Sequence, residues 1–276
     1  MSGLSYRAFK AGLDLTQGPR YRGMMRAARD PRGSQEAALR RILSANADTE
    51  FGREHGFARV SGLREYRQAV PVCTYEDLRE AIERQELTGD RCLTQEQPVY
   101  YHRTSGTVGA PKDIPVTPSG LAQMKRDQRL SAYVWARHTG VLESKVLGIG
   151  GAAVEGRMAG GTPFGSASGL LYRSQSRLVR SRYVLPAEVS EIEDYDLRYL
   201  TIAVYGLSEG AVTGAATANP STFLRLLAVV HDNADTVFDA IATGRLPESP
   251  PGLSLKARPE RARALSRWLE AAGRLT

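Results

Sequence analysis

Apolar residues recur every three or four positions along much of the chain, a spacing that places them on one face of an α-helix. Leu39, Ile42 and Leu43 share such a face, and Thr74 with Asp77 three residues later is typical of a capping-box helix start. This pattern predicts helices over residues 34–47, 74–87, 119–138, 194–207, 220–230 and 234–243, with a last helix beginning at Pro259.

Shorter apolar runs rich in valine, isoleucine and tyrosine are interspersed with these helices and favour strands. They lie at residues 97–102, 114–117, 145–151 and 211–218, whereas residues 155–169 are rich in glycine and predict a loop. Strands and helices are mixed and no internal repeat is present. The residues alone therefore indicate a protein of the α/β or α+β class.

The chain has the composition of a folded globular protein. It has 276 residues, of which 42% are hydrophobic and 24% are charged. No apolar run approaches the ~20 residues of a membrane span, and the N-terminus lacks the apolar core of a secretory signal. The two cysteines, Cys73 and Cys92, lack metal-ligand spacing and favour a reducing compartment. We therefore expect a cytoplasmic protein with no membrane partner.

The two ends of the chain carry its net charge of +7. Residues 1–50 hold nine basic and five acidic residues, and residues 251–276 hold six basic and two acidic ones, so each end contributes +4. The intervening residues hold 22 basic and 23 acidic residues, a net charge of −1. No zinc finger, RNP-like motif or basic–aromatic stripe is present. We expect solvated basic surfaces and no nucleic-acid partner.

Residues 104–112, Thr-Ser-Gly-Thr-Val-Gly-Ala-Pro-Lys, have the most specific chemistry in the chain. The glycines let backbone N–H groups approach phosphate oxygens, the hydroxyl groups donate hydrogen bonds, and Lys112 supplies a positive charge. Such a loop predicts binding of ATP or a related nucleotide. It is not a Walker A loop, because Asp113 follows Lys112 where serine or threonine is required. The glycines at 148–151 also lack the third glycine of a dinucleotide-binding fingerprint.

The loop resembles the phosphate-binding signature of adenylate-forming enzymes, Thr/Ser-Ser/Gly-Gly-Thr/Ser-Thr-Gly-x-Pro-Lys, at eight of nine positions. Over about residues 40–245 the chain resembles the auxin-responsive-promoter family of acyl-acid amido synthetases, whose bacterial members the segments 165–170 and 218–222 also resemble. The supporting motifs, in order, are Thr49-Glu50-Phe51-Gly52, Tyr66, Val70-Pro71-Val72, Tyr75-Glu76-Asp77-Leu78, Ile82-Glu83-Arg84 and Lys112-Asp113-Ile114-Pro115.

This resemblance implies the first part of a luciferase-like adenylating N-terminal domain, an α/β fold with mixed sheets flanked by helices. We expect a basic N-terminal segment at 1–33, a partial adenylating domain at 34–245, and a proline-rich loop with a terminal helix at 246–276. Members of the family are considerably longer. We expect their later segments, including a mobile C-terminal domain, to be absent from this chain, so that a missing C-terminal half or a partner chain would supply them.

The implied reaction is an ATP-dependent ligation in two steps. A carboxylic acid reacts with ATP to give an acyl-adenylate and pyrophosphate, and an amino acid then forms the amide and releases AMP. ATP and Mg²⁺ are the implied cofactors, with small carboxylic acids and amino acids as substrates. A non-catalytic nucleotide-binding protein, or pseudo-enzyme, is the alternative interpretation. A different P-loop kinase or NTPase is a third, which the missing Walker spacing disfavours.

The resemblance also implies site residues. It assigns phosphate binding to Thr104, Ser105, Gly106, Thr107, Val108, Gly109 and Lys112. Val108 departs from the family pattern because valine has no hydroxyl, which costs about 1 kcal/mol for a lost hydrogen bond. The candidates for an acyl-acid pocket are Met124, Gln128 and Arg129 on the helix after the loop, with Ser166 and Ser168 in the glycine-rich segment. No catalytic residue or metal ligand is assigned, and His102 is the histidine nearest the loop in sequence.

Overall fold

The chain divides into two compact units in the computed structural model. The loop unit comprises Phe9–Val134 and Val154–Ala167, and the helical unit comprises Met1–Ala8, Trp135–Ala153 and Ser168–Thr276. Two long helices, α1 (Gly3–Ala27) and α6 (Pro118–His138), contribute residues to both units. The structure describes residues 3–104, 106, 110–248 and 251–273.

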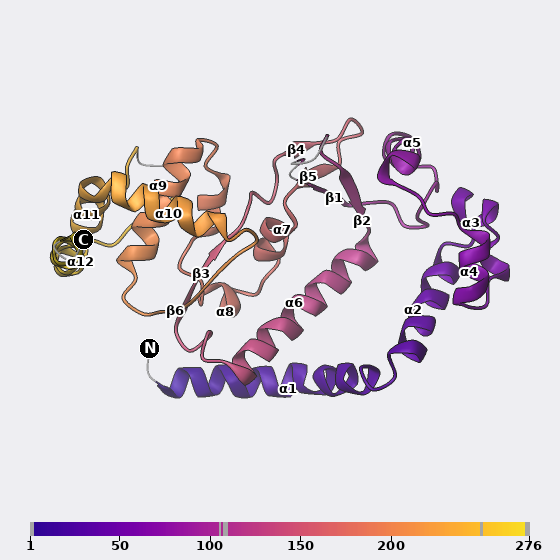
Figure 1. Ribbon diagram of the computed structural model, residues 1–276, viewed down its shortest axis with the longest axis horizontal. Helices are drawn as coiled ribbons and strands as arrows, with labels where there is room; N and C mark the ends of the chain where they lie inside the picture. Colours follow the sequence, from indigo (N-terminus) through magenta and orange to yellow (C-terminus); the bar gives the residue numbers. More distant parts are fainter. Residues whose placement is uncertain (1–2, 105, 107–109, 249–250, 274–276) are drawn as a thin grey trace. The chain divides into compact units, whose positions relative to one another are not determined.

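The loop unit is built around a four-stranded sheet of order β2-β1-β5-β4 (Figure 1). Strand β1 is antiparallel to β2 and parallel to β5, and β4 is antiparallel to β5. The strands are β1 (Tyr100–Arg103), β2 (Asp113–Val116), β4 (Gly156–Arg157) and β5 (Pro163–Gly165). The remaining elements are α2 (Pro31–Ala45), α3 (Glu50–Glu54), η1 (Phe57–Arg59), α4 (Leu63–Ala69) and α5 (Tyr75–Thr88).

Helix α5 begins with the capping box that the sequence predicts. The backbone N–H and the hydroxyl of Thr74 both donate to the Asp77 carboxylate at 2.7 Å, and these bonds lower the pKa of Asp77. Further along the helix, Glu86 accepts hydrogen bonds from the N–H groups of Gly160 at 2.7 Å and Thr162 at 3.3 Å. These contacts hold α5 against the hairpin of β4 and β5.

The prediction of a loop over residues 155–169 is wrong in part, because β4, β5 and the start of helix α7 (Ala167–Arg173) lie there. Strand β5 pairs with β1, and β4 pairs with β5; the pairing with β1 is a tertiary contact that local composition does not encode. The helix predicted from Ser119 begins at Pro118. Its first turn is capped by the Thr117 hydroxyl, which accepts from the N–H of Gly120 at 3.1 Å.

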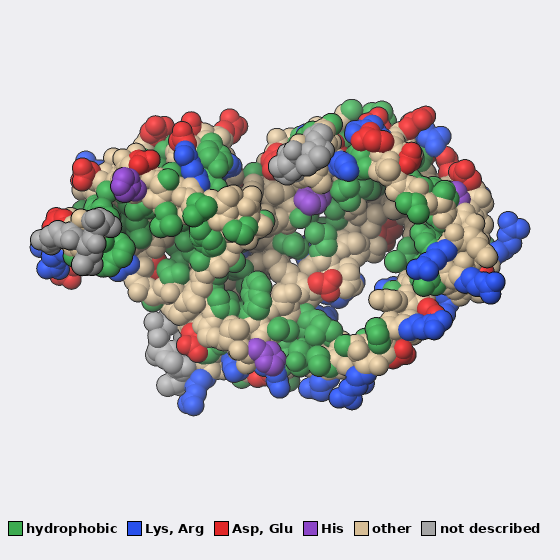
Figure 2. Space-filling view, in the orientation of Figure 1, with side chains coloured by type: hydrophobic (Ala, Val, Ile, Leu, Met, Phe, Trp, Pro, Cys, Tyr) green, Lys and Arg blue, Asp and Glu red, His purple; other side chains and the backbone are tan. Residues whose placement is uncertain are grey.

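Helix α1 is an element that the hydrophobic pattern does not predict. Its sequence is rich in glycine and arginine, and its buried residues within the described range are Phe9, Gln17 and Gly18. Figure 2 shows Lys and Arg side chains along α1 and α2, as the charge distribution predicts for the N-terminal segment. None of the helices in the described ranges is long and apolar enough to span a membrane.

The helical unit packs its helices around a core in which Val204, Val237 and Ile241 are fully buried. Its parallel strand pair is β3 (Lys145–Ile149) with β6 (Val212–Thr217), both predicted from the sequence. The other elements are α7 (Ala167–Arg173), α8 (Arg177–Arg180), η2 (Ala187–Glu191), α9 (Tyr195–Ser208), α10 (Ser221–Asp232), α11 (Ala234–Thr243) and α12 (Pro259–Gly273). The predicted mixed α/β class with sheets flanked by helices is confirmed.

Candidate functional site

The candidate phosphate-binding segment, residues 104–112, is the loop of the hairpin that joins β1 to β2. Two hydrogen bonds close its neck. The backbone N–H of Thr104 donates to the Lys112 carbonyl at 3.0 Å, and the N–H of Lys112 donates to Thr104 Oγ1 at 3.0 Å. A hydroxyl oxygen that accepts one bond keeps its own O–H for donation. Thr104 can therefore close the neck and still donate to a ligand.

Gly106 adopts the left-handed conformation, with φ at +64°. Residues with a Cβ take this conformation only at a cost, so the backbone itself requires glycine here. A loop that turns back in this way can direct successive N–H groups toward one anion. Ser105, Thr107, Val108 and Gly109 lie outside the described residues, and their assignment to phosphate binding stays a prediction.

An ion pair lies directly below the neck, where Arg103 and Asp113 face each other across β1 and β2. Arg103 Nε donates to Asp113 Oδ1 at 2.8 Å and Nη2 donates to Oδ2 at 2.9 Å, a bidentate arrangement. The guanidinium carbon also lies 3.4 Å from the centroid of the Phe164 ring on β5. The hydrogen bonds to Asp113 raise the pKa of Arg103, which keeps its charge.

Tyr75, the first residue of α5, links that helix to the neck. Its hydroxyl oxygen accepts from the N–H of Asp113 at 2.9 Å. Two cations lie near its ring, Lys112 Nζ at 5.8 Å and the Arg79 guanidinium carbon at 4.8 Å from the ring centroid. Hydrogen bonds from Arg79, with a smaller contribution from Lys112, lower the pKa of Glu76. The neck is therefore bordered by an ordered cluster of charged groups.

The structure brings two of the three helix candidates for the acyl-acid pocket together. Met124 and Gln128 are four residues apart on α6 and both are half-buried, so they share one face. Arg129 is exposed. It follows Gln128 directly on the helix, so its side chain is rotated by about 100° around the helix axis from that of Gln128. The predicted role of all three in acid binding stays a prediction.

The two serine candidates lie in different units, and each forms a hydrogen bond within its own unit. The Ser166 carbonyl, just after β5, accepts from the Tyr100 hydroxyl at 3.1 Å in the loop unit. Ser168 Oγ accepts from the N–H of Gly151 at 3.2 Å in the helical unit. Next to it, a Cβ on Gly169 would lie 2.5 Å from the Ala153 nitrogen, so only glycine fits. Ser168 thus contributes to the packing of the turn after β3.

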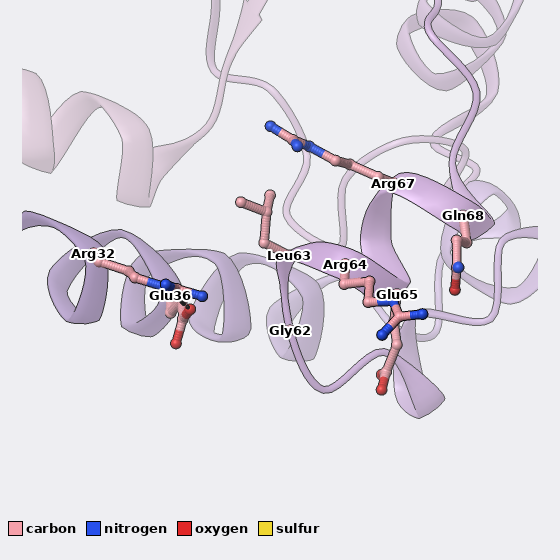
Figure 3. A pocket seen from close by; sticks show the side chains of 8 residues that line it. All are labelled: Arg32, Glu36, Gly62, Leu63, Arg64, Glu65, Arg67 and Gln68. Carbon is pink, nitrogen blue, oxygen red and sulfur yellow. Dashed lines mark hydrogen bonds and ion pairs between the residues drawn. The ribbon is translucent and has the colours of Figure 1, made fainter.

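A separate depression of 720 Å³ lies between α2 and α4 in the loop unit (Figure 3). Its charges are largely engaged: Arg32 bonds to Glu36 at 3.3 Å, and Glu65 accepts from the Ser61 N–H at 2.7 Å. Figure 3 shows Arg67 directed away from Arg64 and Glu65. Ligand pockets have polar groups that converge on one point, and this depression lacks them. It is lined by Arg32, Glu36, Gly62, Leu63, Arg64, Glu65, Arg67 and Gln68.

Metal ligands are not grouped at the loop. In the ranges that the structure describes, no three histidine, cysteine or acidic side chains come close enough to hold a metal ion. Asp113, the carboxylate next to the loop, is engaged by Arg103. His102 is half-buried in β1, opposite Ile114.

The sequence pattern does not identify the residues that support the neck. Tyr75 and Asp113 belong to motifs that carry the family resemblance, whereas Arg103 and Phe164 lie in no such motif. One signal was present: Arg103 and Asp113 carry opposite charges and flank the nine-residue loop symmetrically. In a hairpin such positions face each other, which favours an ion pair. The part played by Tyr75 and Phe164 depends on tertiary contacts.

Comparison with known proteins identifies relatives of this chain. Residues 20–274 match the GH3 family N-terminal domain. Indole-3-acetic acid-amido synthetase GH3.15 of Arabidopsis thaliana is 31% identical over 222 residues, which cover 77% of this chain and 37% of that protein. Indole-3-acetic acid-amido synthetase GH3.3 of the same plant is 26% identical over 224 residues, with the same coverage. The chain thus spans well under half the length of these relatives.

Solved structures agree with this relationship. The GH3.15 acyl acid amido synthetase matches with a TM-score of 0.69 and 26% identity, covering 84% of this chain and 44% of that one. A structure of AtGH3.15 in complex with 2,4-DB has the same fold, with a TM-score of 0.71 at 24% identity over 84% of this chain and 43% of that one. The fold, the ordered motifs and the match over residues 20–274 agree, and the chain belongs to the GH3 family.

Proposed function

We propose that this chain binds ATP through the 104–112 loop and serves in the ATP-dependent joining of a carboxylic acid to an amino acid. The observation that carries the proposal is the closed neck of the loop, with Gly106 left-handed and Lys112 at its edge, in a chain of the GH3 family. The relatives named as indole-3-acetic acid-amido synthetases support a carboxylic acid as the substrate and an amide as the product.

In the first step, a carboxylate oxygen attacks the α-phosphorus of ATP and the bond from that phosphorus to the bridging oxygen breaks. Negative charge then grows on the leaving pyrophosphate. Donors fixed in advance around that charge stabilise it without reorganisation. We assign this role to the Lys112 ammonium group, the Thr104 hydroxyl and the backbone N–H groups of the loop.

In the second step, the amine nitrogen of an amino acid attacks the acyl carbon of the adenylate. The bond from that carbon to the AMP oxygen breaks, AMP leaves with the bonding electrons, and the nitrogen loses a proton. None of the described residues is assigned as the base. The half-buried pair Met124 and Gln128 is our candidate for contact with the acid, because apolar surface with one amide suits a small organic acid.

Mg²⁺ is expected to accompany ATP, since it is usually held by phosphate oxygens with one or two carboxylates. The described residues contain no group of three or more histidine, cysteine or acidic side chains that could hold a metal ion, and Asp113 is bound to Arg103. The proposal therefore assigns no residue of this chain as a magnesium ligand and includes no step through the ion.

The test is exchange of labelled pyrophosphate into ATP in the presence of a panel of aryl and indole acids. It is run with the 276-residue chain alone and with the chain joined to the C-terminal part of the Arabidopsis GH3.15 relative. We expect acid-dependent exchange in at least the joined form, reduced about tenfold or more by Lys112→Ala. Absence of exchange in both forms would contradict adenylation.

A second candidate is nucleotide binding without adenylation. Val108 favours it, because the family pattern has threonine or serine at that position and valine supplies no hydroxyl. ATP binding without exchange would support this second function. Restoring the hydroxyl with Val108→Thr distinguishes the two, since acquired exchange would show that the hydroxyl was the missing group.

A further inference from the structure

We propose that Tyr75, Arg103, Asp113 and Phe164, hereafter the neck cluster, position the 104–112 loop for its nucleotide. This inference rests on the proposed ATP-binding function of the loop. The four residues are positioning residues. Arg103 and Asp113 flank the loop, Tyr75 and Phe164 contact them, and none of the four is assigned to contact ATP. They come from α5, β1, β2 and β5, so four elements determine the geometry of one loop neck.

Several contacts converge on Asp113. Its carboxylate accepts hydrogen bonds from two nitrogens of the Arg103 guanidinium, at 2.8 and 2.9 Å. Its backbone N–H donates to the Tyr75 hydroxyl at 2.9 Å. One residue thus has its side chain bound by β1 and its backbone bound by α5. Lys112 is the residue directly before Asp113, the first residue of β2. Fixing Asp113 therefore also restricts the position of the Lys112 backbone at the end of the loop.

Arg103 lies in a partly shielded environment. The side chain is 31% exposed, that of Asp113 is 14% exposed, and the Phe164 ring lies 3.4 Å from the guanidinium carbon. An ion pair shielded in this way is screened by salt much less than an exposed pair. The flat guanidinium fits between carboxylate and ring, a geometry that lysine cannot reproduce.

Lys112 itself also contacts the neck cluster. Its ammonium nitrogen lies 5.8 Å from the centroid of the Tyr75 ring, within the range of a cation–π interaction. The same tyrosine therefore contacts Asp113 through its hydroxyl and Lys112 through its ring. A side chain held near its working position loses less conformational entropy when it binds a ligand. The neck cluster thus restricts the Lys112 side chain before a polyphosphate binds.

The test uses two variants that each remove one contact and keep the shape of the side chain. Tyr75→Phe removes the hydroxyl and keeps the ring, and Asp113→Asn removes the charge of the carboxylate. Matched controls are Tyr66→Phe in α4 and Asp196→Asn, whose carboxylate pairs with Arg225 in the helical unit. The dissociation constants of ATP and of inorganic pyrophosphate are measured by calorimetry for every form of the full chain.

We expect Tyr75→Phe to weaken ATP binding about 5-fold and Asp113→Asn about 10-fold or more. Arg103→Lys should weaken ATP binding as much as Asp113→Asn does. Lysine keeps the positive charge but cannot form the two parallel hydrogen bonds of the guanidinium to Asp113. Amide hydrogen exchange should accelerate in peptides from residues 103–116 and stay unchanged in peptides from α9. A role limited to overall stability would instead lower the melting temperature and accelerate exchange throughout the chain.

The outcomes separate this inference from the proposed function. If the unmodified chain binds neither ATP nor pyrophosphate, the proposed function and the inference both fail. If it binds ATP and both variants bind equally well, the proposed function stands and the positioning role is overturned. If Asp113→Asn does not fold, Tyr75→Phe decides the question, because it removes a single oxygen atom.

Discussion

Two adjacent tyrosines in β1 differ in a way that the sequence does not reveal. Tyr100 and Tyr101 are both buried, at 3% and 0% exposure. The Tyr100 hydroxyl donates to the Ser166 carbonyl at 3.1 Å, whereas the Tyr101 hydroxyl has no hydrogen-bond partner among the described residues. A buried polar group without a partner costs about 1–3 kcal/mol. Similar residues at neighbouring positions therefore contribute differently to stability.

This difference predicts opposite effects of the same substitution. Tyr100→Phe should lower the free energy of unfolding by about 1 kcal/mol, because it removes a hydrogen bond and leaves the Ser166 carbonyl with one partner fewer. Tyr101→Phe should leave that free energy unchanged or raise it. Urea denaturation of both variants measures the effect. A loss of more than about 1 kcal/mol for Tyr101→Phe would show that its hydroxyl has a partner.

Gly106→Ala tests the left-handed turn of the loop. Alanine at φ +64° should cost about 1–2 kcal/mol of local strain, which the loop relieves by changing its conformation. We expect weaker ATP binding with little change in melting temperature. The control is Gly12→Ala in α1, where a Cβ would meet no atom within 4 Å and the helix favours alanine. Equal ATP affinity for Gly106→Ala and the unmodified chain would contradict the role of this turn.

At the level of single elements, helix caps are the best-defined local signals in this chain. Asp194 Oδ1 accepts from the N–H of Leu197 at 2.7 Å at the start of α9, a helix whose buried face includes Val204. Asp194→Ala should therefore lower the free energy of unfolding by about 1 kcal/mol. Glu193→Ala, which changes the neighbouring exposed position, should have a smaller effect. Equal effects of the two substitutions would mean that charge rather than capping is responsible.

Elements specified by local chemistry were predictable from the sequence, and elements specified by distant contacts were not. The capping box of α5 and the end of α11 at Gly244 follow from the residues at those positions. Strand β5 depends on pairing with β1, a partner about sixty residues away in sequence, and β4 pairs in turn with β5. The apolar residues of helix α1 are interspersed with glycine and arginine, and they offer only a weak periodic signal.

The same distinction applies to the candidate site. The loop could be identified from its composition, because glycines, hydroxyls and a lysine act together within nine residues. The neck cluster could not, because Tyr75 and Phe164 are brought to Arg103 and Asp113 only by the packing of α5 and β5. The residues around a loop that fix its shape come from elements that the local sequence does not identify.

At the scale of the whole molecule, alkaline pH should weaken the fold through its buried tyrosines. Tyr172 donates to the Leu185 carbonyl at 2.6 Å, and burial raises its pKa from an ordinary 10.0 to about 12. The folded state thus holds this proton more tightly than the unfolded state. Its contribution to stability is complete below pH 10 and is lost as the pH rises toward 12.

The measurement is the free energy of unfolding in urea as a function of pH. We expect a constant value between neutral pH and pH 10 and a fall between pH 10 and 12, and Tyr172→Phe should make this fall smaller. Tyr100 has a pKa raised by burial to about 12 as well, so Tyr100→Phe should reduce the fall independently. A fall of the same size in both variants and in the unmodified chain would contradict the assignment to these tyrosines.

The central claim is that the loop between β1 and β2 binds a polyphosphate, and direct titration of the 276-residue chain with ATP tests it. We expect measurable binding that Lys112→Ala weakens about 10-fold or more, since a hydrogen bond to a charged group is worth about 1.5–3 kcal/mol. Lys125→Ala, on α6, should bind as the unmodified chain does. Absence of ATP binding, or equal affinity in the Lys112→Ala variant, would contradict the claim.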